Sequence, residues 1–142
     1  MAENIRLEIV TPEKAIVSEE AKIVMAPGEL GEFGVLSGHT PFMTSLQLGS
    51  VHYEDSSGTE RFVFVSGGFA EALPDRVTIL ADSAERRRDI DVERAKAAKE
   101  RAERRLSGTE TSRGDADIDF TRARAALMRA INRIRLAETR RI

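Results

Sequence analysis

The most constraining feature of this sequence is an abrupt change of residue pattern near Ala81. The first 81 residues hold all four prolines and alternate apolar with polar side chains, as at Ile5, Leu7 and Ile9. After Ala81 no proline occurs, and alanine, arginine and glutamate dominate. A period of two is typical of β-strands, whereas Ala, Arg and Glu are strong helix formers. The chain should therefore contain a β part followed by an α part.

Turn-forming residues divide the β part into short strands. They recur about every 8 to 12 residues, a rhythm that predicts an antiparallel β-sandwich. The clearest hairpin joins 50–53 to 61–65 through Asp55-Ser56-Ser57-Gly58, whose residues tolerate turn dihedrals. A last strand, 76–80, is expected to close the sheet. The breakers are Thr11-Pro12, Pro27-Gly28, 38–41, 55–58, Gly67-Gly68 and Pro74-Asp75.

The α part predicts two helices, about 91–106 and 118–139, in an antiparallel hairpin. A polar stretch with two glycines, 107–115, separates them. Two aspartates stand where each helix begins, Asp89 and Asp91 then Asp117 and Asp119, and the pattern does not decide which of each pair is the N-cap.

The facing stripes of these helices are mostly small. Small side chains bury little apolar area, and isolated helices of this length are marginal in water. The hairpin should therefore be the least stable part of the molecule. The stripes are Ala95, Ala98, Ala102 and Leu106 on the first helix, and Ala123, Leu127, Ala130, Ile131, Ile134 and Ala137 on the second.

Composition excludes several classes of protein. The 142 residues, 41% hydrophobic and 32% charged, fit one compact domain with an appendage. No apolar run approaches the roughly 20 residues of a spanning helix, and the N-terminus resembles neither a signal nor a transit peptide. We expect a soluble protein, and its composition is compatible with a reduced, cytoplasmic compartment. The absence of cysteine excludes disulfides and thiolate catalysis, and two histidines leave little for a metal site.

Charge is distributed unevenly along the chain. Residues 1–88 carry 8 Lys or Arg against 14 Asp or Glu, whereas residues 89–142 carry 14 against 10. From Phe120 onward there are seven arginines against the single Glu138. A cationic tail of this kind is expected to bind an anionic partner. The alternatives are a nucleotide, a nucleic acid and an acidic protein surface.

No catalytic motif is present. The glycine-rich segment 28–41 lacks the Lys-Ser/Thr of a phosphate-binding loop. His39 has no carboxylate at triad spacing, so a nucleophilic site is not expected. No candidate pairs a nucleophile with a base, and we expect no catalytic residue and no metal ligand.

Charged residues of the α part form a candidate anion site. Arg129 and Arg133 lie four apart on one helical face, where like charges repel. In an antiparallel hairpin they could converge with residues of the first helix on one anion, since guanidinium groups suit phosphate and carboxylates accept from an amine or a hydroxyl. The alternative is an ordinary solvated polar face. The candidates are Glu85, Asp91, Arg94, Arg101, Arg129 and Arg133.

Several motifs occur together at characteristic spacings. They are Gly31-Glu32-Phe33-Gly34, Gly38-His39-Thr40-Pro41, Ser66-Gly67-Gly68-Phe69-Ala70-Glu71, Val77-Thr78-Ile79-Leu80-Ala81-Asp82 and the two-helix tail. On these motifs the chain resembles the ε subunits of F-type ATP synthases over essentially its whole length.

The resemblance implies a non-catalytic rotor subunit of the central stalk that couples proton translocation to ATP synthesis. A β-sandwich of about ten strands, residues 1–86, would bind the γ subunit and the c-ring, with Glu32 toward the ring and His39 toward γ. A helical hairpin, residues 87–142, would be regulatory. The protein would be peripheral at the cytoplasmic face of the bacterial inner membrane, without inserting into it. Ser37 departs from the proline usual in the family, which implies a looser loop.

The resemblance also assigns roles to the hairpin. Ile90-Asp91-Val92-Glu93-Arg94-Ala95 matches the family's nucleotide motif, and the family pattern selects the six residues of the candidate anion site as an ATP site. No cofactor would be required, and ATP would be a regulatory ligand. When extended, the second helix would meet acidic surfaces of the α/β hexamer and inhibit ATP hydrolysis through Arg122, Arg124, Arg129, Arg133 and Arg135.

A second function remains open at this stage. The arginine-rich helix could belong to a nucleic-acid-binding module, because clustered arginines supply phosphate contacts. The acidic β part and the few aromatic residues argue against it, and the rotor function implies no nucleic-acid partner.

Overall fold

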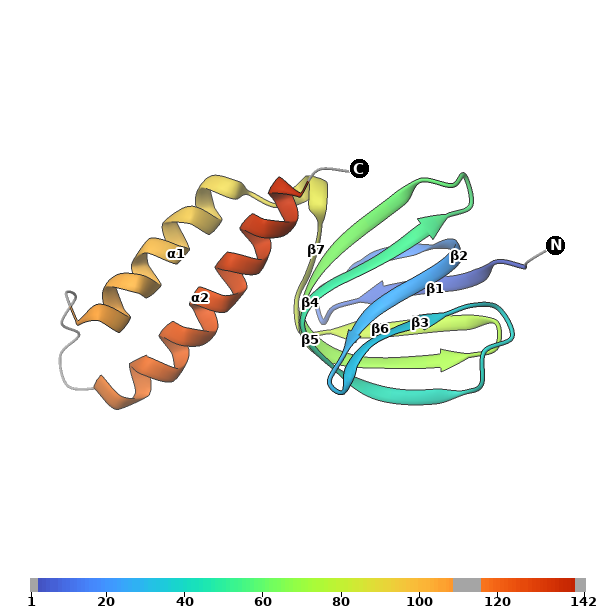
Figure 1. Ribbon diagram of the computed structural model, residues 1–142, viewed down its shortest axis with the longest axis horizontal. Helices are drawn as coiled ribbons and strands as arrows, with labels where there is room; N and C mark the ends of the chain where they lie inside the picture. Colours follow the sequence, from blue (N-terminus) through green and yellow to red (C-terminus); the bar gives the residue numbers. More distant parts are fainter. Residues whose placement is uncertain (1–2, 109–115, 140–142) are drawn as a thin grey trace. The chain divides into compact units, whose positions relative to one another are not determined.

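The structure, a computed structural model, describes residues 3–108 and 116–139. Contacts divide the chain between Arg87 and Arg88 into two units, a β unit and a helical unit (Figure 1). Most of the expected interhelical loop, 109–115, and the last two arginines lie outside the described residues.

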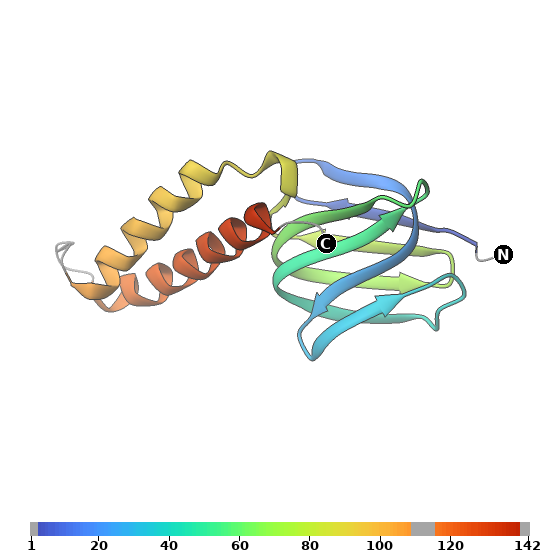
Figure 2. The ribbon, with the colours of Figure 1, turned by 45° about the horizontal axis from the view of Figure 1, so that its top comes forward.

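The β unit is a sheet that closes on itself. Its order is β1-β6-β5-β4-β2-β3, and β1 also pairs with β2, so five strands form a ring around a common core (Figures 1 and 2). β3 pairs with β2, and β7 pairs with β5. The strands are β1 (Ile5–Val10), β2 (Ala15–Gly28), β3 (Gly31–Val35), β4 (Phe42–Asp55), β5 (Glu60–Leu73), β6 (Arg76–Ala81) and β7 (Ala84–Arg86).

The predicted sandwich is confirmed, but two details differ. Seven strands appear among the described residues rather than about ten, because β2, β4 and β5 each run unbroken for 14 residues. In addition, β1 pairs with β6 in parallel, whereas the other pairings are antiparallel. The strand predicted to close the sheet is β6, and the short β7 that follows it was missed.

Gly67-Gly68, predicted to break a strand, lies inside β5. Both residues have positive φ angles, 115° and 127°. A Cβ on Gly68 would lie 2.0 Å from the carbonyl oxygen of Leu80 on β6. Glycine therefore lets β5 continue in close contact with β6 where any other residue would force the strands apart.

The core follows the predicted period of two. On β1 the inward residues Ile5, Leu7 and Ile9 are fully buried, and their neighbours are partly exposed. Facing strands supply the remaining large side chains of the core, among them Val24, Val51, Tyr53, Val63, Val77 and Ile79.

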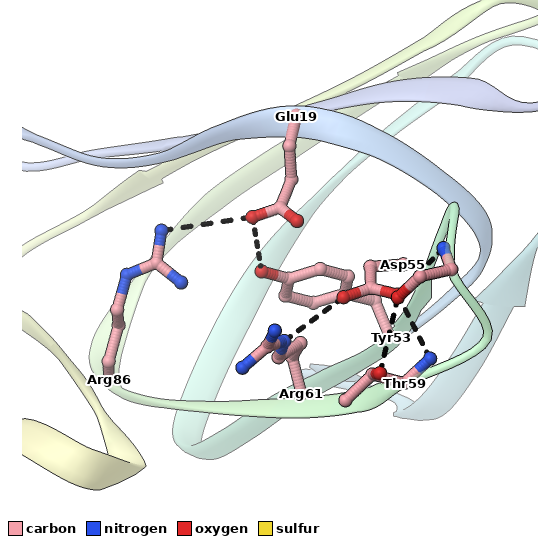
Figure 3. Close-up of polar contacts among 7 residues, drawn as sticks. Glu19, Tyr53, Asp55, Thr59, Arg61 and Arg86 are labelled. Atoms are coloured by element: carbon pink, nitrogen blue, oxygen red, sulfur yellow. Dashed lines mark hydrogen bonds and ion pairs between the residues drawn. The ribbon is translucent and has the colours of Figure 1, made fainter.

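The β4–β5 hairpin turns where predicted and is fastened by Asp55. One oxygen of this buried carboxylate accepts from the backbone N–H of Ser57 at 3.0 Å and of Thr59 at 2.9 Å, and from the Ser57 hydroxyl at 2.6 Å. The other accepts from Nε of Arg61 at 3.1 Å (Figure 3). Hydrogen bonds from the Ser57 hydroxyl, the Thr59 backbone and Arg61 hold the pKa of Asp55 well below its usual range.

The helical unit consists of α1 (Val92–Ser107) and α2 (Ala116–Glu138), which run antiparallel (Figure 1). Asp91 is the N-cap of α1, because its Oδ1 accepts from the backbone N–H of Arg94 at 3.0 Å. This decides between Asp89 and Asp91. At the other end Gly108 adopts the left-handed conformation, with φ 77°. α2 begins before both Asp117 and Asp119.

Small residues hold the two helices together. Of the ten residues predicted to face the partner helix, Ala95, Ala102, Ala123 and Ala130 are buried and the other six are partly buried. Leu136, which was not predicted, is also buried. The apolar contact in this unit is thus far smaller than the core of the β unit.

Asp55→Asn should weaken the β unit and flatten its pH dependence. Because folding lowers the pKa of Asp55, its stabilisation is present above the pKa of the unfolded chain, about 4, and is lost as the pH falls below it. The variant should be less stable than wild type at pH 7, and the difference should shrink by pH 3. Tyr53, the single tyrosine in a chain without tryptophan, reports unfolding by fluorescence in urea.

The matched control is Asp75→Asn in the exposed turn before β6. It should leave the pH dependence of the unfolding midpoint unchanged. A pH-independent difference between Asp55→Asn and wild type would contradict the role given to the Asp55 charge.

Candidate functional site

The first candidate residue, Glu32, lies on β3 beside the turn that joins β2 to β3. Its carboxylate is exposed, and its Oε2 lies 3.3 Å from Nε2 of His52 on β4. The turn itself consists of Glu29 and Leu30, and the side chain of Leu30 is fully exposed. The resemblance singled out Glu32, but neither the His52 contact nor the exposure of Leu30 was predicted.

His39 lies in the loop between β3 and β4 and is partly buried. Its Nδ1 is hydrogen-bonded to the carbonyl oxygen of Thr40, and its ring lies 4.9 Å from the ring of Phe42. Phe42 in turn meets Phe33 edge-on at 5.0 Å. The backbone N–H of Gly38 donates to the carbonyl oxygen of Pro74 at 2.8 Å. Glu32 therefore lies near the start of β3, whereas His39 follows the end of that strand.

An exposed apolar row crosses the outer face of β1, β6, β5 and β4. Val10 pairs with Leu80, and Leu80 pairs with Phe69. Phe69 pairs with Ser45, two residues from Met43 on the same face of β4. Leu80 is 55% exposed, Phe69 57% and Met43 68%. We call Val10, Leu80, Phe69 and Met43 the apolar row, and sequence reasoning missed it because its members meet only through strand pairing.

Residues of the candidate ATP site belong to both units. Glu85 lies on β7 of the β unit, opposite Phe64 of β5. The other five lie in the helical unit, where Asp91, Arg94 and Arg101 are exposed and Arg129 and Arg133 are partly buried. The carboxylate of Asp91 already caps α1 through its Oδ1. A ligand that binds Asp91 must therefore share this carboxylate with the helix cap.

The antiparallel arrangement places Arg94 and Arg133 toward the same end of the hairpin. Arg94 stands in the first turn of α1, and Arg133 stands five residues before the end of α2, with Arg129 about one turn further from that end. Arg101 lies seven residues further along α1, about 10 Å away along the axis. Arg101 is thus set apart from Arg94 along α1, and the predicted ATP site stays a prediction.

The arginines assigned to inhibition line α2. Arg122, Arg124 and Arg135 are exposed, and no acidic residue occurs from Phe120 to Ala137. Phe120 and Met128 on the same helix are also nearly half exposed. α2 therefore presents cationic groups together with apolar side chains.

A polar cluster, also missed by sequence reasoning, joins β4, β2 and β7 (Figure 3). The hydroxyl of Tyr53 donates to Oε2 of Glu19 at 3.1 Å, and a guanidinium nitrogen of Arg86 lies 3.8 Å from the same oxygen. Burial, aided by the Glu19 charge, raises the pKa of Tyr53 to about 12. The next residue, Arg87, places its guanidinium carbon 4.7 Å above the Phe62 ring. The last residues of the β unit, Arg86 and Arg87, are therefore held against its strands by two contacts, one with Glu19 and one with Phe62.

Two further observations bear on chemistry. Within residues 3–108 and 116–139, no group of three or more His, Asp or Glu side chains is arranged to hold a metal ion. In the same part of the chain, neither helix has the length and apolar character needed to cross a membrane.

Known families match both units. Residues 4–87 match the β-sandwich domain of the ATP synthase delta/epsilon chain, and residues 88–138 match the long α-helix domain of the same chain.

Individual relatives agree with these matches. The ATP synthase epsilon chain of Desulfosudis oleivorans is 66% identical over 106 residues, which is 75% of this chain and 80% of that protein. The epsilon chain of Anoxybacillus flavithermus is 52% identical over 103 residues, 72% of this chain and 76% of that one. The resemblance to ε subunits of F-type ATP synthases is thus confirmed.

Solved structures agree in fold. A chain of the Euglena gracilis mitochondrial ATP synthase, from its OSCP/F1/c-ring structure, aligns with a TM-score of 0.75 at 24% identity, covering 91% of this chain and 78% of that one. A chain from the central stalk and c-ring of the Tetrahymena thermophila enzyme aligns with a TM-score of 0.60 at 9% identity, covering 96% and 98%. With both of its units matched along nearly their whole length, this chain belongs to the delta/epsilon chain family of ATP synthases.

Proposed function

We propose that this chain is the ε subunit of the central stalk in a bacterial F-type ATP synthase. Its β unit binds the γ subunit and the c-ring, so that rotation driven by protons passes through the stalk to the catalytic hexamer. The subunit itself performs no catalysis and is peripheral at the cytoplasmic face of the membrane. Family membership favours this function over nucleic-acid binding.

The observation that carries the proposal is the apolar row. Cross-strand neighbours on a solvated sheet face are usually polar, yet Leu80, Phe69 and Met43 are all more than half exposed. Exposed apolar side chains gathered on one sheet face are typical of a protein interface. The residues are held by the closed sheet, so that little conformational entropy is lost when a partner covers them. We assign this surface to the γ subunit.

The remaining contacts of the β unit follow from its position in a rotor. Glu32, exposed beside the β2–β3 turn, faces the polar loops of the c-ring. His39, packed on Phe42 in the β3–β4 loop, lies toward γ. In this arrangement the two contacts use opposite ends of β3.

The helical unit regulates the enzyme in this proposal. α2 offers Arg122, Arg124, Arg129, Arg133 and Arg135 to acidic surfaces of the α/β hexamer when the hairpin is extended, and this contact blocks rotation in the direction of hydrolysis. ATP binds the closed hairpin and opposes the extension. No other cofactor is needed.

The weak helix contact makes ATP effective as a regulator. Four buried alanines contribute little apolar area, and the nearby charges of Arg129 and Arg133 repel each other. A polyphosphate placed between Arg94, Arg129 and Arg133 converts that repulsion into charge-assisted hydrogen bonds. At a hundredfold excess over Kd, ATP adds about 2.7 kcal/mol to the stability of the closed hairpin.

Phe69→Ala should weaken binding of the chain to the isolated γ subunit. Burying a phenylalanine side chain contributes about 1.5–3 kcal/mol, so the Kd should rise by at least about tenfold. Calorimetry on purified proteins measures the change. The side chain points out of the core, so the urea midpoint followed by Tyr53 should not move.

Thr78→Ala is the control, because Thr78 pairs opposite Glu71 on the same outer sheet face. It should bind γ as the wild type does. Equal Kd values for wild type and Phe69→Ala would remove the apolar row from the γ interface.

Arg94→Ala and Arg133→Ala should each bind ATP at least about tenfold more weakly than wild type, since a charge-assisted hydrogen bond contributes about 1.5–3 kcal/mol. Saturating ATP should raise the melting temperature of the helices, followed by circular dichroism, and leave the Tyr53 signal of the β unit unchanged. Arg122→Ala, which removes a charge at the far end of α2, is the control. If all four proteins share one affinity for ATP, the arginines form only a solvated face.

Removal of residues 120–142 should raise ATP hydrolysis by the assembled enzyme. The truncation deletes seven arginines and one glutamate, and with them the cationic surface that opposes rotation. The increase should be largest at low ATP, where the wild-type hairpin is open. Steady-state hydrolysis of the reconstituted complex measures it, and an unchanged rate at low ATP would refute inhibition by this helix.

A further inference from the structure

The most exposed apolar side chain in the described part of the chain stands on the β2–β3 turn. Leu30 is 100% exposed, and two carboxylates, Glu29 and Glu32, flank it in sequence. The turn has only two residues, because Gly28 already pairs with Gly31. An isolated leucine at the tip of so short a turn contributes nothing to the core of the β unit.

Side chains of β4 fasten this turn. Nε2 of Gln47 donates to the carbonyl oxygens of Gly28 at 2.9 Å and of Glu29 at 3.2 Å. The backbone N–H of Glu29 donates to the carbonyl oxygen of Ser45 at 2.9 Å, and the Ser45 hydroxyl donates to the Glu29 carboxylate. These four hydrogen bonds restrict the motion of the turn.

Packing restricts the turn further. A Cβ on Gly28 would lie 2.7 Å from the carbonyl oxygen of Gly31 and 2.9 Å from a ring carbon of Phe33. The backbone at the base of the turn therefore lies directly on the Phe33 ring, with no room for a side chain. Leu30 is presented from a fixed backbone.

The second flanking carboxylate is also oriented by β4. Oε2 of Glu32 lies 3.3 Å from Nε2 of His52, and the His52 ring stacks on Phe62 with centroids 5.7 Å apart. Glu29 and Glu32 thus each have a partner on β4, Ser45 and His52. The apolar side chain of Leu30 thus stands between two carboxylates, each of which is oriented by a contact with β4.

We propose that Leu30 is the apolar anchor of the contact with the c-ring. It inserts between loops of the ring at a place bordered by basic side chains, which Glu29 and Glu32 meet. Ser45 and Gln47 are positioning residues that hold the turn in its bound conformation. This inference rests on the proposed function, in which the turn faces the ring.

The physical basis is the low cost of binding through a rigid turn. Ordering a flexible loop consumes part of the interaction energy, and a loop already held by hydrogen bonds avoids that loss. Interfaces concentrate their energy in a few central side chains surrounded by weaker polar contacts. A leucine with a carboxylate on each side has this composition, and its charge suits a basic rather than an acidic partner.

The test compares binding of the full chain to γ alone and to a γ–c-ring complex. For wild type, the ring should increase the affinity. Leu30→Ala should lose at least about tenfold in affinity for the γ–c-ring complex and keep the wild-type Kd for γ alone. Met128→Ala, an exposed apolar residue of α2, is the matched control and should behave as wild type with both.

The positioning role is tested with Gln47→Ala. This variant should weaken binding to the γ–c-ring complex and speed amide hydrogen exchange at Leu30 and Gly31, with the Tyr53 unfolding midpoint unchanged. Because Gln47 acts through Leu30, the double variant Leu30→Ala/Gln47→Ala should bind no more weakly than Leu30→Ala. Additive losses would show that Gln47 acts independently and overturn its positioning role.

Two outcomes separate this inference from the function on which it rests. If wild type binds γ and the γ–c-ring complex with the same Kd, the turn does not face the ring and the proposed ring contact is wrong. If the ring strengthens wild-type binding and Leu30→Ala retains the full gain, the ring contact holds and Leu30 is not its anchor.

Discussion

The double pairing of β1, antiparallel with β2 and parallel with β6, is the constraint on which the rest of the β unit depends. It closes the sheet, so that no edge remains between these strands and every inward position points to one core. The register of the strand pairing therefore determines which residues are neighbours on the outer face of the sheet as well as in the core. The apolar row exists because Leu80 is level with Val10 on one side and with Phe69 on the other.

Much of the fold could be predicted because it depends on local sequence. Period two gave the inward residues of β1, and Asp55 marked a hairpin whose hydrogen bonds its own loop supplies. Strand number could not be predicted in the same way. Gly67-Gly68 reads as a turn, yet close contact with Leu80 makes these glycines part of a continuous strand. Whether a glycine ends a strand depends on what lies beside it.

The candidate functional surfaces also differ in whether local sequence predicts them. An antiparallel hairpin can be predicted to place the start of its first helix beside the end of its second, and Arg94 and Arg133 lie toward that end, although a shared anion site there stays a prediction. The fastening of the β2–β3 turn has no such signal. Gln47 stands nearly twenty residues from the carbonyl groups it meets, and only the β2–β4 pairing brings them together.

The two units differ in how much apolar burial stabilises each of them. The β unit buries branched or aromatic side chains from every strand of its ring, and this burial stabilises it. The described part of the helical unit buries four alanines, Ile90 and Leu136, and it carries like charges four residues apart. A free energy the size of one bound nucleotide is comparable with that contact. In the proposed function, regulation by a small ligand therefore falls to the helices, and the surfaces that transmit rotation lie on the closed sheet.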